Sequence, residues 1–259
     1  MKLLVASEYS DPSFHQSLII TRLQNIRGST TSKPYPPLLL ITKNIEGCRD
    51  ILLECRYLNQ ELLVHITVTG YGHTILEPNV KPWEEVVENT KILIHENLLN
   101  PEKLVLRVDP LIPRPTRLEN TILPALIQEF SKLGIRRLRT SVIDYYPHVR
   151  ERFGNAGLAF NPTFSVPYNI KLEALQRVSR IAESLNMQVE ICAEGISSDL
   201  IGNNVSIQGC ASQKDWIVSL DPVINPQRKL CTCDLAKEDL LKGLEKGCPH
   251  RCLYCYWRY

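Results

Sequence analysis

Six short apolar runs, separated by segments long enough to hold helices, are the feature that most constrains the fold of this chain. They cover residues 3–6, 38–41, 63–68, 104–108, 138–143 and 188–192. Between them, apolar residues return every three or four positions, most clearly in 83–96, 117–133 and 172–185, which predicts helices. Alternation of strand and helix favours parallel strands joined by right-handed crossovers. We therefore expect an α/β fold with a six-stranded parallel, TIM-like (β/α)6 partial barrel.

The regular alternation stops after residue 194, which suggests how the chain is organised. We expect a barrel over residues 1–196 and a cysteine-rich tail over 197–259 that packs on the barrel mouth. A short helix is predicted within this tail over 237–246. At 259 residues and 44% hydrophobic content, the chain can bury one sizeable core, so barrel and tail should form a single structural unit.

Charge and hydropathy narrow the class of protein. The 30 basic and 28 acidic residues nearly balance, so the net charge indicates neither a nucleic-acid nor a membrane partner. No segment approaches the ~20 apolar residues of a membrane helix, and the apolar stretch at 3–6 is too short for a signal peptide. We therefore expect a cytoplasmic protein with no membrane partner.

Polar or glycine-rich residues follow each predicted strand. In parallel β/α architectures the carboxyl ends of the strands form the ligand-binding face. Short stretches at 11–12, 77–79 and 161–162 are interpreted as turns because they contain proline. A core or turn role is an alternative for each remaining candidate. By strand-end position, the candidate substrate or cofactor contacts are Tyr71, Arg107, Asp109, Asp144, Tyr145 and Glu194.

Nine cysteines stand in this sequence, seven of them in its last third. In a reducing compartment they are better candidates for metal binding or catalysis than for disulfides. Cys48 and Cys55 are seven residues apart on a predicted helix, hence on one face. We expect these two to behave as small hydrophobic residues.

The last three cysteines, Cys248, Cys252 and Cys255, have C-x3-C-x2-C spacing with Tyr254 before the third. Three thiolates suit a [4Fe-4S] cluster that keeps one iron without a protein ligand. A structural zinc site normally has four protein ligands, and the tail could supply the fourth through His250 or a further cysteine, so zinc is the alternative. Bound metal would also order the end of the chain.

Of the seven cysteines in the last third, four remain once these three are set aside: Cys192, Cys210, Cys231 and Cys233. Four thiolates can close a second [4Fe-4S] cluster or a zinc site. The fold would have to bring Cys192 and Cys210 to the C-x-C pair. The alternative is that the four are buried or spare thiols.

The run from Cys248 to Cys255 resembles the signature of the radical S-adenosylmethionine (SAM) superfamily, including the aromatic residue before the third cysteine. In that superfamily the motif usually follows the first strand of the partial barrel, whereas here it follows the sixth. The first and sixth strands flank the opening of a partial barrel, so a tail can fold back over the mouth. We therefore expect Cys255 to lie near the carboxyl ends of strands one and six.

Along almost its whole length the chain is similar to the domain of unknown function 1848 family. The matching stretches are 6–7, 42–44, 67–72, 77–80, 107–110, 192–194, 210, 231–233 and 248–256. The loop at 8–12 departs from the basic, aspartate-containing segment of the family. Residues 42–44 do not look like the Gly-Gly-Glu that many radical SAM enzymes use to hold the SAM amino group.

These resemblances imply an enzyme that reductively cleaves SAM at an open [4Fe-4S] cluster and abstracts hydrogen from an unknown substrate. The substrate could be a small molecule, a peptide or a nucleic acid, and an external donor such as flavodoxin or ferredoxin would supply electrons. Cys248, Cys252 and Cys255 would bind the cluster. The expected cofactor contacts are Thr42, Lys43, Asn44 and Tyr254.

A non-catalytic module stabilised by zinc or an iron–sulfur cluster is the alternative. Its tail would be stapled by metal, and interleaved aromatic and arginine side chains would bind single-stranded nucleic acid by stacking and phosphate contact. The polar strand ends would then have no role. The staple would use Cys231, Cys233, Cys248, Cys252 and Cys255, and the surface Arg251, Tyr254, Tyr256, Trp257, Arg258 and Tyr259.

Overall fold

One parallel sheet forms the centre of the molecule. The computed structural model describes residues 1–29, 35–113, 122–223, 230–245 and 247–257. Within them, eight strands pair in the order β7-β6-β5-β4-β3-β2-β1-β8, and every pairing is parallel. The strands are β1 (Leu3–Ala6), β2 (Leu38–Thr42), β3 (Leu62–Thr67), β4 (Leu104–Leu111), β5 (Arg137–Val142), β6 (Gln188–Ile191), β7 (Val205–Ile207) and β8 (Lys237–Asp239).

All six predicted strands are present as β1 to β6, but the expected count of six was too low. Two three-residue strands, β7 and β8, extend the sheet at its edges. The helix predicted over 237–246 was wrong, because its first residues form β8 and pair with β1. Among the described strands no pairing joins β7 to β8, so the sheet keeps two open edges.

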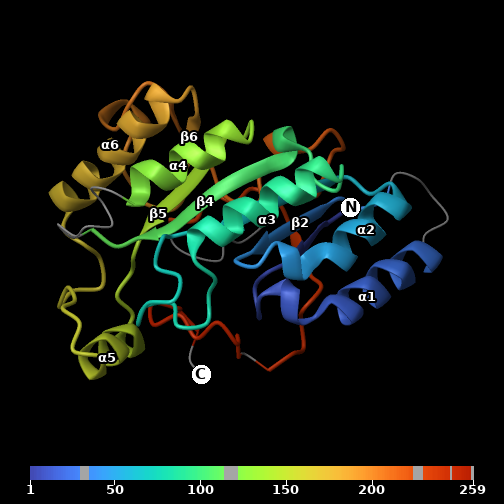
Figure 1. Ribbon diagram of the computed structural model, residues 1–259, viewed down its shortest axis with the longest axis horizontal. Helices are drawn as coiled ribbons and strands as arrows, with labels where there is room; N and C mark the ends of the chain where they lie inside the picture. The colour runs from blue at the N-terminus through green and yellow to red at the C-terminus, as the bar shows by residue number, and fades with distance from the viewer. Residues whose placement is uncertain (30–34, 114–121, 224–229, 246, 258–259) are drawn as a thin grey trace.

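Helices cover one face of this sheet. Figure 1 shows most of them along one side of the strands, with α5 below the sheet beside the C-terminal tail. The predicted helix at 117–133 is observed from residue 123 to 132, and its expected start at 117–121 lies outside the described residues. The helices are α1 (Gln16–Ser29), α2 (Arg49–Leu58), α3 (Trp83–His95), α4 (Leu123–Lys132), α5 (Pro147–Asn155) and α6 (Tyr168–Ser184).

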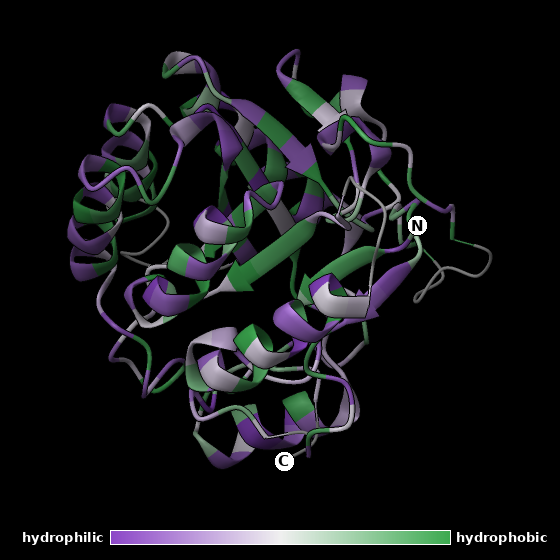
Figure 2. Ribbon diagram, turned by 90° about the vertical axis from the view of Figure 1, so that its right-hand side faces the viewer, coloured by the Kyte–Doolittle hydropathy of each residue, from purple (hydrophilic) through white to green (hydrophobic). Residues whose placement is uncertain are grey.

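Two apolar clusters lie on opposite faces of the sheet because successive strand residues point to opposite sides. Leu4 and Ala6 of β1 join the helix-covered cluster, which also contains Cys48 and Cys55 as small buried residues. The helices carry both hydrophobic and hydrophilic residues, as amphipathic helices do (Figure 2). No helix in the described part of the chain is long and apolar enough to span a membrane.

The other face, here called the inner face, is covered without α-helices in the described residues. Its cluster combines alternate strand residues with residues 208–223 and 230–235, called the cover segment. The cover segment is therefore part of the core and not an appendage. The strand residues are Leu3, Val5, Leu39, Leu63 and Val105, and the cover-segment residues are Ala211, Trp216, Leu220, Cys233 and Leu235.

Polar and charged residues continue the inner face on β3, β5 and β6. Arg139 is 1% exposed and pairs with Glu190, while its Nη1 donates to His65 Nε2 at 3.1 Å. Arg137 bridges Glu190 and Asp215, the latter from the cover segment. These ion pairs fasten the cover segment to the strands.

Candidate metal centres

The three last cysteines, called the terminal thiols, lie on two short turns. The Arg251 N–H donates to the Cys248 carbonyl at 3.1 Å, and the Cys255 N–H donates to the Cys252 carbonyl at 3.0 Å. The thiols of Cys248 and Cys255 both act electrostatically on that of Cys252. The C-x3-C-x2-C spacing therefore gathers three sulfurs in one small region.

Loops that follow the first strands anchor the tail. Figure 1 shows the red tail beside α5 and the loop after β3. The tail thus lies at the carboxyl ends of β1 to β3, which include strand one, beside which Cys255 was expected. Three hydrogen bonds fix it: Leu253 N–H to the Leu76 carbonyl (3.0 Å), Asn79 Nδ2 to the Pro249 carbonyl (2.7 Å) and Trp257 Nε1 to the Glu8 carbonyl (2.5 Å).

Arg152 of α5 also holds these turns through hydrogen bonds. Its guanidinium donates to the carbonyls of Cys252 (3.4 Å), Cys255 and Trp257 (3.1 Å). Burial raises the pKa of the Cys255 thiol, and the positive charges of Arg152 and Lys43 oppose that rise. The site therefore holds cationic groups next to thiols that a metal would deprotonate.

A buried trio of side chains lies next to Cys252. Lys43 Nζ is 2.7 Å from Glu77 Oε1 and 2.8 Å from the Tyr254 hydroxyl, which itself donates to Glu77. Burial alone would lower the pKa of Lys43, but the charges of Glu77 and Cys252 outweigh it and raise that pKa. Burial and Glu77 raise the pKa of Tyr254 well above its ordinary value. Lys43 is therefore a buried ammonium beside a candidate metal ligand.

Asp11 organises the loops after β1 and β2. Its carboxylate accepts from Thr42 Oγ1 at 2.8 Å and from the Lys43 N–H at 2.7 Å, and lies 3.1 Å from His250 Nε2. Burial would raise the pKa of Asp11, but His250 and the backbone donors lower it. The Asn44 N–H donates to Thr42 Oγ1 at 2.9 Å. Thr42 and Asn44 therefore shape the loop, whereas Lys43 and Tyr254 lie beside the thiols.

Sequence reasoning missed two carboxylates of this site. Asp11 and Glu77 were interpreted as turn residues, yet they are 8% and 1% exposed and both contact the tail. Both precede proline in loops at strand ends, and that position was the available signal.

The nitrogens of His250 face Asp11 and the Asn79 carbonyl, which leaves neither directed at the terminal thiols. Nothing in the sequence indicated the clamp by Arg152.

The other four cysteines, called the four-thiol group, are brought together by the fold. Cys192 follows β6, Cys210 follows β7, and Cys231 and Cys233 precede β8. The Sγ atoms of Cys210 and Cys233 are 3.5 Å apart. Cys233 also forms thiol hydrogen bonds with Cys192 and Cys231, which bond to each other. Residues up to 41 positions apart therefore share one site.

Two cations lie near the four-thiol group. The hydrogen bond from Cys233 lowers the pKa of Cys210 to about 6, with help from the charges of Arg107 and Lys237. The same thiol contacts raise the pKa of Cys233. Cys210 thus has a lowered pKa, whereas the pKa values of Cys231 and Cys233 are raised.

Arg107 interacts electrostatically with the four-thiol group and with Tyr256 of the tail. It forms an ion pair with Asp109, which accepts a hydrogen bond from Ser141 Oγ. Burial would lower the pKa of Arg107, but the charge of Asp109 and further charges on Cys210, Cys192 and Tyr256 raise it. Of the residues predicted from strand-end position, Arg107 and Asp109 therefore lie between the four-thiol group and the tail.

The remaining predicted catalytic residues lie elsewhere. Glu194 pairs with Lys171 at 2.7 Å and interacts electrostatically with Asp144. Tyr71 lines a narrow crevice on the helix-covered side of the sheet, and Tyr145 is buried in the core. The strand-end rule thus located two residues near the thiols, and the other four interact elsewhere.

Neither thiol group has ligand geometry as it stands. In the described ranges, no set of three or more His, Cys, Asp or Glu side chains is arranged to hold a metal ion. The four-thiol group is instead linked through its own S–H hydrogen bonds. Metal binding at either group would require deprotonation and rotation of the side chains.

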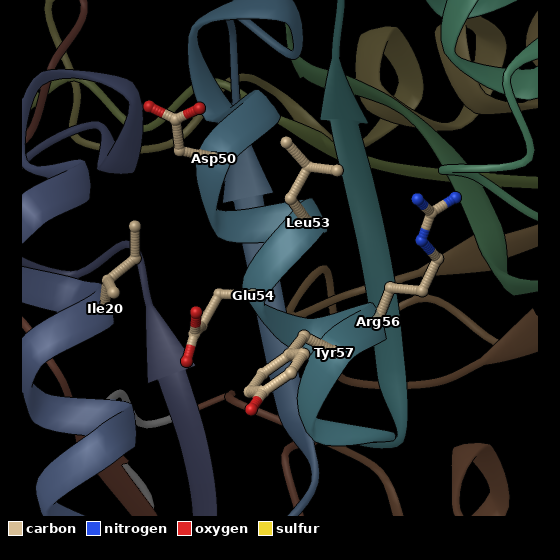
Figure 3. A pocket seen from close by; sticks show the side chains of 6 residues that line it. All are labelled: Ile20, Asp50, Leu53, Glu54, Arg56 and Tyr57. Carbon is tan, nitrogen blue, oxygen red and sulfur yellow. The ribbon is translucent and has the colours of Figure 1, made fainter.

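A surface groove between α1 and α2 lies apart from this chemistry (Figure 3). None of the residues predicted for a site lines it. Its side chains are a mixture of exposed apolar and charged groups, which gives no specific chemistry. They are Ile20, Asp50, Leu53, Glu54, Arg56 and Tyr57.

Comparison with known proteins assigns the chain to a family. A solved structure with a similar arrangement is the mannotriose complex of the Thermomonospora fusca β-mannanase, with 11% sequence identity and a TM-score of 0.33. The match covers 78% of this chain and 73% of that one. A search of curated proteins finds no match. The family model described as "Domain of unknown function (DUF1848)" matches residues 22–257, and the chain therefore belongs to the domain of unknown function 1848 family.

Proposed function

We propose that this chain is a radical SAM-type enzyme whose terminal thiols, Cys248, Cys252 and Cys255, hold a [4Fe-4S] cluster with one open iron. The observation that carries the proposal is the place of these thiols, on a turn fastened over the carboxyl ends of parallel strands, where ligands bind in such folds. Such a cluster supplies the electron that cleaves SAM and starts hydrogen abstraction from a substrate.

The donor set suits a three-ligand site better than a closed zinc site. The nitrogens of His250 face Asp11 and a carbonyl, so this residue is a poor fourth ligand. Cys231 and Cys233 are hydrogen-bonded within the four-thiol group. Three thiolates would thus leave one metal position open, which is what a catalytic site needs and a structural zinc site lacks.

Neighbouring side chains offer the binding groups that an amino-acid-like cofactor requires. The methionyl part of SAM carries one carboxylate and one ammonium group. Lys43 and Glu77, a buried ion pair beside Cys252, would bind these two groups in place of a Gly-Gly-Glu motif. Tyr254 would hold both side chains in place through its hydroxyl.

The substrate would lie deeper, toward the inner face. Here the sheet would act as an open, TIM-like barrel whose mouth the tail covers. Arg107 and Asp109 are the charged pair available for substrate contact. A reduced flavodoxin or ferredoxin in the cytoplasm would supply electrons through the tail, where Cys248 and Cys255 are partly exposed.

The nucleic-acid-binding alternative has weaker support. Two of its proposed stacking residues already have partners: Tyr254 is 9% exposed against Glu77, and Trp257 stacks on Tyr9 with ring centroids 6.3 Å apart. Residues 258 and 259 lie outside the described part of the chain.

Formation of 5′-deoxyadenosine tests the proposal. Protein reconstituted anaerobically with iron and sulfide is incubated with SAM and dithionite, as wild type and as Cys252→Ala. Wild type should release 5′-deoxyadenosine, and Cys252→Ala should release none because each cluster thiolate binds an iron that has no second protein ligand. Cys55→Ala, a buried cysteine outside both thiol groups, is the matched control and should keep the activity.

Equal product from wild type and Cys252→Ala would contradict the proposal. So would the absence of product from wild type shown spectroscopically to hold a reduced cluster. Either result would favour the non-catalytic alternative.

A further inference from the structure

We propose that the four-thiol group binds one tetrahedral zinc ion, and not a second iron–sulfur cluster. The evidence begins with the 3.5 Å distance between the Sγ atoms of Cys210 and Cys233. Zinc–sulfur bonds of about 2.3 Å in a tetrahedron place the sulfurs roughly 3.8 Å apart. In a four-iron cluster each thiolate binds a different iron, so the sulfurs are held farther apart. The observed spacing therefore suits a single shared ion.

The ligand set is closed, as structural zinc sites are. Cys233 interacts with the thiols of Cys192, Cys210 and Cys231, so the four thiols form one contact group. Cys192 and Cys233 are each 8% exposed. Cys210 and Cys231 are partly exposed, but four thiolate ligands would fill all positions of a tetrahedral ion and leave none for water or substrate, which is typical of structural zinc.

Backbone geometry brings the ligands together without help from a metal. A Cβ on Gly209 would lie 2.3 Å from the backbone nitrogen of Cys233, so only glycine permits this approach of the two segments. The Asp234 N–H then donates to the Ala211 carbonyl at 3.1 Å. The glycine before Cys210 therefore places that thiol opposite the C-x-C pair.

Charge at the site is suited to a tetrathiolate complex. Four thiolates around a divalent zinc ion carry an excess of negative charge. Arg107 interacts electrostatically with Cys192 and Cys210, and Lys237 interacts with Cys210 and Cys233. These two cations, which also pair with Asp109 and Glu8, would partly balance that charge in a buried environment.

The ion would join segments that flank opposite edges of the sheet, in addition to the hydrogen bonds between residues 211–213 and Asp234. Cys192 and Cys210 follow β6 and β7 at one edge of the sheet, whereas Cys231 and Cys233 precede β8 at the other edge. Replacing the S–H hydrogen bonds with four zinc–sulfur bonds requires loss of the thiol protons and small side-chain rotations. A bound ion would thus clamp both edges across the inner face.

Metal analysis of a variant without the terminal thiols tests this proposal independently of the radical SAM assignment. The host is the full chain carrying Cys248→Ala, Cys252→Ala and Cys255→Ala, purified anaerobically from cells supplied with zinc and iron. We expect about one zinc per chain, given four thiolate ligands per ion, and no acid-labile sulfide. Adding Cys210→Ser should remove most of this zinc, whereas adding Cys55→Ser should leave it unchanged.

Cobalt(II) provides a second measurement that does not depend on how the serine variant folds. Titrating the metal-free host with one equivalent of Co(II) should produce the visible bands and strong thiolate charge-transfer absorption of a tetrahedral tetrathiolate ion. Iron with stoichiometric sulfide in the host would overturn the proposal in favour of a second cluster. A folded host that binds neither zinc nor cobalt, or that isolates under reducing conditions with a Cys210–Cys233 disulfide, would also overturn it.

Discussion

The two thiol groups of this protein differ in how their cysteines are brought together. The terminal thiols lie within eight residues of one another, on turns held by Arg152 and by the loops of β1 to β3. The four-thiol group draws its members from the flanks of β6, β7 and β8, and its sulfurs are in direct contact. One group is local in sequence and offers three thiols. The other is dispersed in sequence and offers four, which is enough to close a metal site.

This contrast suggests what to look for in other cysteine-rich chains. A closed group stabilises the fold because its ligands come from distant elements, and a shared ion removes much of their freedom in the unfolded chain. A local group constrains few residues, so the loss of its metal should affect chemistry more than folding. The two groups should therefore respond differently to the same substitution.

The largest expected difference concerns thermal stability. Cys210→Ser should lower the midpoint of thermal unfolding by roughly 10 °C, because losing a few kcal/mol of metal-linked stability shifts the midpoint by about 2–4 °C per kcal/mol in a chain of this size. Cys252→Ser should lower it by only a few degrees. Circular dichroism of zinc-loaded, reduced protein measures both. Equal destabilisation by the two substitutions would remove the distinction between the groups.

Lys43→Met should affect the terminal thiols both chemically and thermodynamically. The change leaves the Glu77 carboxylate, 1% exposed, without its 2.7 Å ionic partner, at a cost of about 3 kcal/mol for breaking a buried ion pair. Denaturant unfolding measures this loss. We also expect 5′-deoxyadenosine formation to fall at least tenfold.

Lys171→Met is the matched control, since Lys171 forms a similarly buried pair with Glu194 at 2.7 Å, away from the terminal thiols. Its stability should fall by a comparable amount while 5′-deoxyadenosine formation is retained. If both lysine variants lose activity equally, the role of Lys43 is structural only.

The sequence predicted the centre of the fold better than its edges. The strands β1 to β6 have apolar runs because each is buried on both faces. The edge strands β7 and β8 have three residues each and contain Ser206 and Glu238, so no apolar run reveals them. The spacing of Leu240, Leu241 and Leu244 resembles that of a helix. The residues just before them nevertheless form β8, because they pair with β1. Pairing with a distant segment decided the structure at this point.

The candidate site was predictable where it is local. The terminal thiols are visible from spacing alone, whereas the burial of Glu77 depends on Tyr254, 177 positions later. Asp11 likewise becomes a buried ion-pair partner only when His250 folds back onto it. An acidic residue before proline resembles an exposed turn until the returning chain covers it. No pattern within a short window carries that information.

Arg152→Gln should loosen the tail without changing the four-thiol group. The guanidinium holds three carbonyls of the tail, two of them on candidate ligands. Losing these bonds should cost about 1–2 kcal/mol, equivalent to roughly a tenfold faster amide exchange across 250–257. Hydrogen exchange measured by mass spectrometry tests this. Arg150→Gln, on the same helix and bonded to the Pro162 carbonyl, should leave the tail unchanged.

The smallest effect we predict is a pH dependence of the free energy of unfolding. It comes from His65 on the inner face, the side of the four-thiol group. Burial, reinforced by the charge of Arg139, lowers the pKa of His65 well below its ordinary value. The folded chain therefore keeps His65 neutral at pH 5.5, whereas the unfolded chain binds a proton below about pH 6.5. Because the unfolded state binds more protons, the free energy of unfolding must fall as the pH drops through this range.

His65→Gln separates this contribution from those of other titrating groups. Between pH 7.5 and pH 5.5 the free energy of unfolding should fall by about 1.4 kcal/mol more in the wild type than in the variant. This is the difference expected when pH 5.5 lies about one unit below the unfolded pKa of a group that stays neutral in the folded chain. Urea unfolding at the two pH values measures the difference. A variant that loses as much stability as wild type would show that His65 gains its proton in the folded state. The ion pairs of Arg139 with Glu190 and Asp215 would then have to tolerate a second positive charge beside them.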